Sequence, residues 1–439
     1  MKCLILAAGK GSRLAARGDS KPLVLLLGLT LIERTILTAR SCGLTEFYVV
    51  TGYNGQKVRD FLDEFGRARN IKINHIVNEE WKKENGLSVL KAKQFLDENF
   101  ILLMVDHLFD KSILARLLQQ QLQQDELILV VDSNVKANSL IDTDDATKVL
   151  IEDGKIIDIS KDIAKYNAFD TGIFLCSPSI FSAIETSIAH NNDSTLSGGI
   201  KVLAEARKAR TLDIAGSFWI DLDDERAFQK AQKCLLDRLK KPSDGPISRY
   251  LNRPISTKIT QCLVKTKISP NQLSVFSFIL CLIASALFFK GSYPALFVGA
   301  IFAQIASIID GCDGEIARLK YQESDFGKWF DAVLDRYADG FLFFGLTYHL
   351  FTSTSNLFYL SVGFMAILGS FMNSYTADKY DGIVRKLGVK ARFRIGRDIR
   401  IFIIFLGAIT NQVFAALLLA ALVTNIENIR RVVVAYKNR

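Results

Sequence analysis

The sequence predicts two regions of different fold class: an α/β region whose mostly parallel sheet has helices on both faces, and an all-α transmembrane region of six helices. Three features of the 439-residue chain lead to this prediction. Residues 1–240 alternate strand-like and helix-like segments with regular charge, as soluble α/β domains do. From about residue 270, apolar runs long enough to span a bilayer alternate with short polar breaks. Four aspartates lie among those apolar runs.

The first region contains short β-rich runs with helical stretches between them. The strands are expected over 2–7, 46–51, 72–77, 101–105 and 126–132, and the helices over 30–42, 55–65 and 86–97. Residues 149–159 predict a hairpin, because Asp153-Gly154 supplies the turn geometry. The Pro, Gly and Ser of residues 239–246 interrupt the last helix. We therefore expect a soluble domain over 1–238 and a linker over 239–246.

The second region is expected to begin at the membrane surface. Residues 247–268 are basic and amphipathic, with an interruption at Pro254, which predicts a helix lying in the membrane interface. The membrane domain then covers 269–439. Six spans are expected, over 271–290, 294–318, 327–350, 356–378, 398–411 and 412–432.

The distribution of charge predicts the orientation of these spans. The net charge is +9, but its densest cluster lies between two apolar runs at 379–400, so no nucleic-acid partner is expected. If the chain enters from the cytoplasm, the outer connections carry almost no charge and the inner ones carry this cluster. No signal peptide precedes the first strand. We therefore expect a multi-pass protein of the cell membrane with both active sites in the cytoplasm.

The seven cysteines include no C-x-x-C pair, which disfavours a zinc or redox centre.

The four aspartates fall at the cytoplasmic ends of the second and third expected spans. Asp310 and Asp313 are three residues apart, and Asp331 and Asp335 four apart, so each pair shares one helix face. An uncompensated Asp at the centre of a span costs about 2.5–3.5 kcal/mol, so something must cancel the charge. The short connection 319–326 predicts antiparallel neighbouring helices whose carboxylates form a site for Mg²⁺, Mn²⁺ or Ca²⁺. A buried ion network with Arg and Lys, or a cation pathway, remains an alternative.

The residues around these aspartates have a recognisable spacing. The pattern Asp310-x₂-Asp313-Gly314-x₂-Ala317-Arg318-x₈-Gly327-x₃-Asp331-x₃-Asp335 resembles the signature of the CDP-alcohol phosphotransferases at every fixed position. The resemblance implies a six-helix membrane domain that binds two divalent ions, Mg²⁺ or Mn²⁺, and displaces CMP with an alcohol. It makes the four aspartates metal ligands and gives Asp335 the additional role of general base. It also implies a CDP pocket lined by Asn271, Ser274, Gly314, Ala317 and Arg318, although the family more often has Thr in place of Ser274.

A glycine-rich turn follows the first strand. In residues 6–14 the glycines let backbone N–H groups approach a phosphate, and Arg13 and Lys21 supply positive charge. The segment lacks both the P-loop and the dinucleotide fingerprint. Together with Lys21-Pro22 it resembles the sugar-phosphate nucleotidyltransferases, which implies a Rossmann-like α/β domain over nearly all of residues 1–235.

The second resemblance implies a set of roles in the soluble domain. CTP would be bound by Ala7, Ala8, Gly9, Gly11, Ser12, Arg13, Lys21, Gly86 and Ser88, and the phosphorylated alcohol by Lys148, Asp170 and Gly172. Asp106 and a second carboxylate, Asp221 or preferably Asp223, would hold a divalent metal. Arg13 and Lys21 would stabilise the transition state of nucleotidyl transfer. His107 is either a structural neighbour or a participant.

The two resemblances together suggest that the first site makes the substrate of the second. The fusion resembles the bifunctional family that joins an inositol-1-phosphate cytidylyltransferase to a di-myo-inositol phosphate phosphate synthase. This implies that CTP and inositol-1-phosphate give CDP-inositol and pyrophosphate. Transfer to a second inositol-1-phosphate then gives CMP and phosphorylated di-myo-inositol phosphate, an osmolyte precursor.

The anionic acceptor needs basic partners in the membrane domain. We expect these to be Arg385, Lys386, Arg392, Arg394 and Arg397, which lie in the cytoplasmic cluster. A homodimer is expected because C2 dimers are the commonest assembly. Two alternatives remain: synthesis of a phospholipid on a lipid acceptor, and a cation channel or transporter with a nucleotide-sensing domain.

Overall fold

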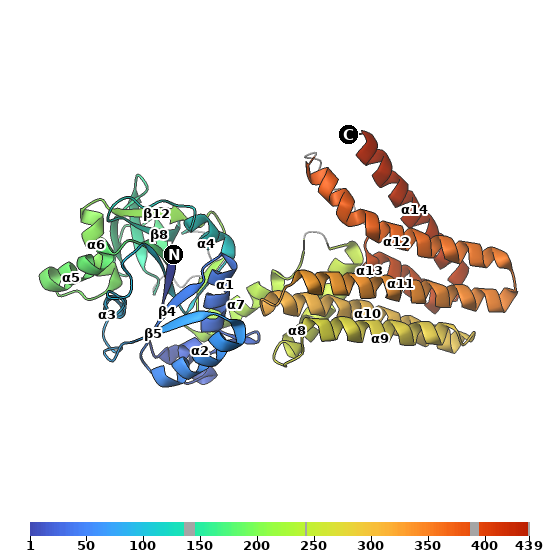
Figure 1. The fold of residues 1–439 in the computed structure, drawn as a ribbon, viewed down its shortest axis with the longest axis horizontal. Coiled ribbons are helices and arrows are strands. Elements are labelled where there is room, and N and C mark those ends of the chain that lie inside the picture. Colours follow the sequence, from blue (N-terminus) through green and yellow to red (C-terminus); the bar gives the residue numbers. More distant parts are fainter. Residues whose placement is uncertain (136–144, 242–243, 387–394, 438–439) are drawn as a thin grey trace. The chain divides into compact units, whose positions relative to one another are not determined.

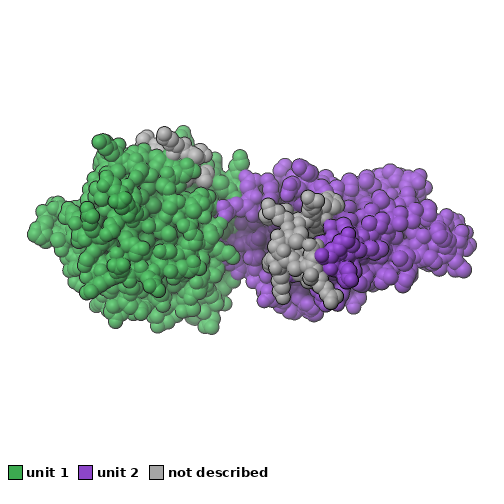
Figure 2. All heavy atoms as spheres, turned by 90° about the horizontal axis from the view of Figure 1, so that it is seen from above, with its two compact units in different colours: residues 1–234 green, residues 235–439 purple. Residues whose placement is uncertain are grey.

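The computed structural model describes residues 1–135, 145–241, 244–386 and 395–437, without the side chains of 378, 381 and 383–386. It divides into unit 1, residues 1–234, and unit 2, residues 235–439 (Figure 2). The predicted order of an α/β region followed by a helical region is confirmed (Figure 1).

Unit 1 is built on a sheet that has nine strands in the described residues, ordered β5-β4-β1-β6-β11-β8-β12-β10-β9 (Figure 1). The strands are β1 (Lys2–Ala7), β4 (Glu46–Thr51), β5 (Lys72–Val77), β6 (Phe100–Met104), β8 (Leu127–Asp132), β9 (Lys148–Glu152), β10 (Lys155–Ser160), β11 (Ala168–Cys176) and β12 (Ala209–Asp213). The expected parallel arrangement is found in β5-β4-β1-β6 and in the β8–β12 pair. The other neighbours are antiparallel, and for β9 and β10 the tight turn between them requires it.

The remaining elements of unit 1 surround this sheet. They are η1 (Ser12–Arg17), η2 (Lys21–Leu23), β2 (Leu25–Leu26), β3 (Leu29–Thr30), α1 (Leu31–Ser41), α2 (Gly55–Arg69), α3 (Asn85–Leu90), β7 (His107–Phe109), α4 (Lys111–Leu117), α5 (Ser179–Asn191), α6 (Leu196–Glu205), β13 (Trp219–Asp221) and α7 (Glu225–Asp237). Every residue of β8 is buried, as are the last five residues of β1 and of β4. Strands buried without alternation are covered on both faces, as the sequence predicts.

Two local predictions have different outcomes. The predicted hairpin is confirmed, because β9 pairs with β10 and both turn residues, Asp153 and Gly154, have positive φ. The helix predicted over 86–97 is wrong in its second half, since α3 ends at Leu90. The buried Val89, Ala92 and Leu96 have helix-like spacing, but the backbone between them forms successive turns. The helical periodicity therefore predicts correctly which side chains are buried, but it does not predict the backbone conformation.

Unit 2 consists of helices. They are η3 (Ser248–Asn252), α8 (Arg253–Leu263), α9 (Pro270–Phe288), α10 (Tyr293–Leu319), α11 (Asp325–Thr354), α12 (Leu357–Lys386), α13 (Arg397–Ile409) and α14 (Val413–Lys437). In the described residues, α9, α10, residues 357–377 of α12, and α14 are long and apolar enough to cross a membrane. Helix α13 has 13 residues, and the first half of α11 carries several charged residues, so six crossings stay a prediction.

The segment before the first apolar helix is anchored by a buried carboxylate. The π-helical turn η3 continues directly into α8, so the backbone is helical from residue 246 to Leu263, and Pro254 is accommodated in the first turn of α8. The predicted helix over 247–268 therefore ends five residues early. Helix α8 packs against α10, where Glu315 is fully buried. Its carboxylate accepts hydrogen bonds from Arg253 Nη1, Ser256 Oγ and Thr260 Oγ1, each at 2.6 Å. These bonds fix one face of α8 to α10.

Replacing Glu315 with Ala should lower the stability of unit 2 by about 3–5 kcal/mol, because it leaves the buried Arg253 cation without one of its partners. The measurement is thermal unfolding of the full chain in detergent. The exposed Glu323→Ala on the following connection is the matched control and should behave as the parent protein. Equal unfolding temperatures for both variants would contradict a structural role for Glu315.

Candidate active sites

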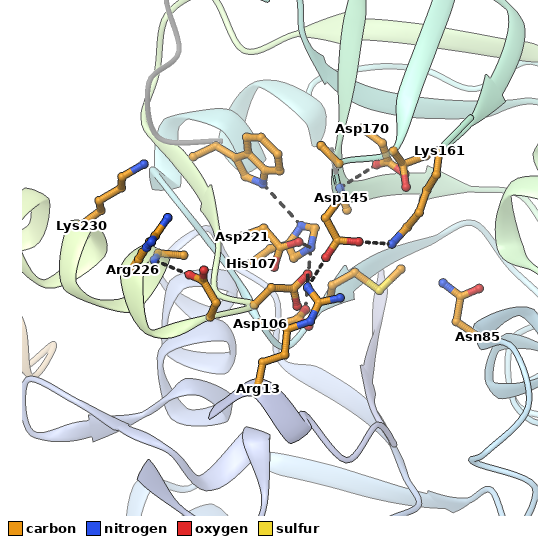
Figure 3. Close-up of a pocket in the computed structure, with 18 residues that line it drawn as sticks. Arg13, Asn85, Asp106, His107, Asp145, Lys161, Asp170, Asp221, Arg226 and Lys230 are labelled. Carbon is orange, nitrogen blue, oxygen red and sulfur yellow. Dashed lines mark hydrogen bonds and ion pairs between the residues drawn. The ribbon is translucent and has the colours of Figure 1, made fainter. Parts of the chain in front are cut away.

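Unit 1 contains a cavity of about 550 Å³ beside the carboxyl ends of β1 and β6 (Figure 3). Clefts at the carboxyl ends of parallel strands are the usual ligand sites of open α/β sheets. Of the predicted residues, Arg13, Asp106, Asp170, Gly172, Asp221 and Asp223 line this cavity. Most of its lining groups are polar or charged, which fits a phosphorylated ligand.

A buried lysine links two of the acidic residues. Lys21 Nζ lies 2.6 Å from Asp106 Oδ2 and 2.7 Å from Asp223 Oδ1, and Arg13 Nη1 lies 3.8 Å from Asp223 Oδ2. Burial raises the pKa of Asp106, but the charges of Lys21 and His107 and the hydrogen bonds to the carboxylate together outweigh it, and the pKa falls to about 2. Gly11 has a φ of 64°, and a Cβ there would overlap the Lys21 side chain. Glycine is therefore needed at this turn so that Lys21 can reach the carboxylates.

Three groups at this site could hold a metal. Asp106, His107 and Asp221 each offer a ligand atom, and these atoms all lie within 4.8 Å of one another. The antiparallel pairing of β13 with β7 places Asp221 opposite His107. Asp221 Oδ1 is buried and has no hydrogen-bond partner among the described residues, as expected of a carboxylate oxygen that serves as a ligand to a cation. The set fits a divalent ion.

His107 is held by its surroundings. Its Nδ1 lies 2.5 Å from the Thr171 carbonyl oxygen, which also accepts a bond from Trp219 Nε1 at 2.8 Å. A carbonyl only accepts, so Nδ1 carries a proton and Nε2 faces Asp221 at 3.4 Å. Burial lowers the pKa of His107, but the carboxylates of Asp221 and Asp106 and the bond to Thr171 together outweigh it and raise the pKa to about 10. Gly172 has a φ of 69°, and a Cβ there would overlap the His107 ring.

Other predicted residues lie differently. Gly86 packs against the backbone of Ser194 and Thr195, and Ser88 is buried and bonded to Asn78, whereas Asn85 beside them lines the cavity. The cavity lining includes Arg13 of the glycine-rich segment, but not Ala7, Ala8, Gly9, Gly11, Ser12 or Lys148.

Sequence reasoning missed some lining residues of this cavity. Lys161, which bonds to Asp145 at 2.7 Å, and Arg226 and Lys230 on α7 also line it. No motif marked these cations, because only the tertiary fold brings the end of β10 and the start of α7 to the cavity.

In unit 2, carboxylates from α10 and α11 meet. Ligand oxygens of Asp310, Asp331 and Asp335 all lie within 4.8 Å of one another. Asp313 is buried and accepts hydrogen bonds from Ser274 Oγ and its neighbour's backbone N–H, that of Gly314. Both helices pack mainly against α9. An all-oxygen set of this kind fits a hard divalent cation.

Arg397 lies inside this carboxylate cluster. Its Nη1 is 2.9 Å from Asp310 Oδ1 and 2.5 Å from Asp335 Oδ1, and its Nε donates to Asp339 at 3.1 Å. The fully buried Asp339 also accepts from Arg400 Nη2 at 2.7 Å and Ser370 Oγ at 2.9 Å. The ion network that was an alternative from sequence is therefore present around Arg397. Sequence reasoning missed Asp339, although its spacing of four from Asp335 would have indicated it.

The remaining predicted residues of unit 2 have these positions. Arg318 folds over Gly314, since a Cβ on Gly314 would lie 3.2 Å from Arg318 Nη1, and Ala317 is buried beside them. Asn271 lies near Gly327. A second cavity, of about 250 Å³, is lined by Asp310, Gly311 and Arg397, with residues of η3 and α8. Residues 392 and 394, and the side chains of Arg385 and Lys386, lie outside what the structure describes.

Comparisons with known proteins define the class of the chain. Residues 3–206 match the MobA-like NTP transferase domain, and residues 267–426 match the CDP-alcohol phosphatidyltransferase family. The chain is thus a nucleotidyltransferase joined to a membrane-embedded CDP-alcohol phosphotransferase, and both predicted reaction classes are confirmed.

Similarity also extends along the whole chain. A Rubrobacter xylanophilus protein named "Bifunctional IPC transferase and DIPP synthase" is 33% identical over 439 residues, covering 99% of this chain and 96% of that protein. A protein of the same name from Aquifex aeolicus is 34% identical over 450 residues, covering 99% and 98%. The chain belongs to this family of bifunctional IPC transferases and DIPP synthases. A solved structure, the inositol-1-phosphate CTP transferase from T. maritima, covers 53% of this chain and 93% of its own, with 24% identity and a TM-score of 0.46.

Proposed function

We propose that unit 1 converts CTP and inositol-1-phosphate to CDP-inositol and pyrophosphate. Unit 2 then transfers phosphoinositol from CDP-inositol to a second inositol-1-phosphate, which releases CMP and gives phosphorylated di-myo-inositol phosphate. The observation that carries the proposal is the full-length similarity to two relatives with this bifunctional name. The two acidic sites support it, because both reactions transfer phosphoryl groups.

In unit 1, Asp106 with Asp221 or Asp223 would hold Mg²⁺ or Mn²⁺. The cluster of Asp106, His107 and Asp221 supports Asp221 as the second ligand, whereas Asp223 carries an ion pair to Lys21. A bound divalent ion would neutralise charge on the transferred phosphoryl group. Lys21 and Arg13 add positive charge beside these carboxylates, where the α-phosphate of CTP would react. The polyol phosphate would lie in the cavity between Asp170 and Lys161.

In unit 2, Asp310, Asp313, Asp331 and Asp335 would hold two Mg²⁺ or Mn²⁺ ions, and Asp335 would take the proton of the attacking hydroxyl. Asn271, Ser274, Gly314, Ala317 and Arg318 would bind the CDP group. Arg397, with the basic residues 385, 386, 392 and 394, would attract the anionic acceptor, and its position beside Asp335 supports this role. The chain would cross the bilayer several times as a homodimer, with both sites on the cytoplasmic face.

The test supplies the purified full chain with CTP, Mg²⁺ and a panel of polyol phosphates. We expect CMP release and a water-soluble phosphodiester with inositol-1-phosphate, and little product with the other polyols. Absence of CMP release with every polyol phosphate would contradict the proposal and leave the channel alternative.

A second candidate keeps both reaction classes but uses a lipid acceptor. A Pyrococcus horikoshii protein named "Archaetidylinositol phosphate synthase" is 31% identical over 183 residues, which cover 41% of this chain and 90% of that protein. Adding a lipid alcohol to the same reaction separates the candidates. A product that partitions into the organic phase would support the lipid acceptor.

Replacing Gly172 with Ala should reduce CDP-inositol formation roughly tenfold or more, because the added Cβ displaces His107 from Asp221. Release of CMP from supplied CDP-inositol should be unchanged. Gly154→Ala is the matched control: Gly154 also has a positive φ, but a Cβ there has no atom within 4 Å. If both variants lose the same activity, backbone strain and not His107 explains the loss.

A further inference from the structure

The linker expected from sequence is fixed to unit 2 at both of its described ends. Leu239 is only 3% exposed, and its carbonyl accepts a hydrogen bond from Arg318 Nη2 at 3.2 Å. The Asp244 carboxylate accepts bonds from Arg253 Nε and Nη2, both at 3.0 Å. These contacts lie beside the aspartate-rich part of α10.

The end of the linker also contacts the start of α13. A Cβ at Gly245 would lie 2.7 Å from Asp398 Oδ2, so a larger residue there would displace the Asp398 carboxylate. The same oxygen accepts a bond from the Ser248 backbone N–H at 2.8 Å. The described residues of the linker are therefore part of the folded membrane domain.

Two arginines near the linker differ in how their charge is balanced. Arg253 is paired with two buried carboxylates, Asp244 at 3.0 Å and Glu315 at 2.6 Å. Arg318 makes no ion pair within the described part of the chain, and its bond to Leu239 is to a neutral carbonyl. Arg318 Nε is buried and has no hydrogen-bond partner there. A buried guanidinium N–H without an acceptor indicates that a ligand supplies one.

A second cation, Lys241, lies two residues after Leu239, whose carbonyl accepts the bond from Arg318. The Lys241 backbone N–H donates to Asp244 Oδ2 at 2.9 Å, which fixes its position in the linker. The Lys241 side chain is exposed, but partial desolvation and the positive charges of Arg318 and Arg253 lower its pKa. Lys241 makes no ion pair with any residue that the structure describes. Two neighbouring cations without carboxylate partners repel each other, and a phosphate between them would remove that cost.

We propose that Lys241 of the linker completes the CDP-alcohol site of unit 2, where its ammonium and the Arg318 guanidinium together bind a phosphate of the CDP group. The inference rests on the proposed function of unit 2. Gly314 supports it, because Arg318 lies over this glycine on the α10 face that carries Asp313. Arg397, which is proposed for the acceptor, lies instead among Asp310, Asp335 and Asp339.

The test compares three variants of the full chain in detergent with Mg²⁺. Lys241→Met removes the charge, Lys241→Arg keeps it, and Lys240→Met removes an exposed neighbouring charge that pairs only with Asp237 at 3.1 Å among the described residues. The measurements are the dissociation constant of CDP by calorimetry and the KM values for CDP-inositol and inositol-1-phosphate, each determined separately.

Lys241→Met should raise the CDP dissociation constant and the KM for CDP-inositol about tenfold or more, because it removes a charge-assisted bond to phosphate. Lys241→Arg should largely restore both values, and Lys240→Met should match the parent protein. Unchanged CDP binding in Lys241→Met would overturn the inference, and so would a rise confined to the KM for inositol-1-phosphate.

Activity measurements on the parent protein distinguish a failure of this inference from a failure of the proposed function. If the parent releases no CMP from CDP-inositol, the function of unit 2 is wrong and the inference falls with it. If the parent is active and Lys241→Met is indistinguishable from it, only the role of the linker is wrong. The rate of CDP-inositol formation by unit 1 should be equal in all variants. Equal rates would show that the substitutions leave unit 1 folded.

Discussion

Replacing Asp335 with Asn is expected to abolish release of CMP from CDP-inositol, with a fall of at least about 10²–10⁴-fold. The carboxylate lies within a cluster with Asp310 and Asp331, and Asn supplies neither the negative charge that a divalent ion needs nor a base for the attacking hydroxyl. Formation of CDP-inositol from CTP should continue at the parent rate. Chromatographic assay of CMP and CDP-inositol in one reaction measures both.

Asp325→Asn is the matched control for this substitution. Asp325 lies on the same helix but is fully exposed at its first turn, so its loss should leave both activities unchanged. Size-exclusion chromatography in detergent checks that Asp335→Asn remains folded, because this aspartate also pairs with Arg397. CMP release at the parent rate from a folded Asp335→Asn protein would contradict the assignment of this cluster as the transfer site.

Replacing Asp106 with Asn is expected to abolish CDP-inositol formation, with a loss of roughly 10³-fold or more, since the metal contribution to phosphoryl transfer is worth several kcal/mol. Asp106 contacts Lys21 and belongs to the candidate metal cluster, so the change affects both sources of positive charge at the site. The measurement is pyrophosphate release from CTP and inositol-1-phosphate.

The control for Asp106→Asn supplies CDP-inositol, the product that this variant should no longer form. Supplied CDP-inositol should restore CMP release by the Asp106→Asn protein, because unit 2 has a separate carboxylate cluster. Asp153→Asn in the exposed β9–β10 turn should retain full pyrophosphate release. Normal pyrophosphate release by Asp106→Asn would show that Asp106 is not a metal ligand for this reaction.

The strands that the sequence predicts at the correct residues share one property. The runs 2–7, 46–51 and 72–77 became strands at the predicted residues, because each is a short β-rich run bounded by polar segments. The helix over 86–97 was overestimated because Val89, Ala92 and Leu96 are buried at helical spacing on a backbone of turns. Hydrophobic periodicity predicts which side chains are buried, but it does not determine the conformation of the backbone that carries them.

The same distinction applies to the sites. The four aspartates of unit 2 could be identified because their spacing within two helices lies in the sequence itself. The position of Arg397 among them could not, because α13 lies far along the chain and only packing brings it to Asp335. The bonds of the linker to Arg318 and Arg253 were missed for a similar reason, since linker composition does not reveal that Leu239 and Asp244 are bonded to the helices of unit 2.

The sequence by itself determined the two fold classes, the carboxylate spacing and the two reaction classes, because these depend on local periodicity and on motifs within short segments. Only the tertiary structure decided which charges balance one another: Lys21 with Asp106 and Asp223, Arg397 with Asp335 and Asp339, and Arg253 with Glu315. Ion pairing depends on distances of a few ångströms between residues that are far apart in sequence, and the folded packing sets those distances.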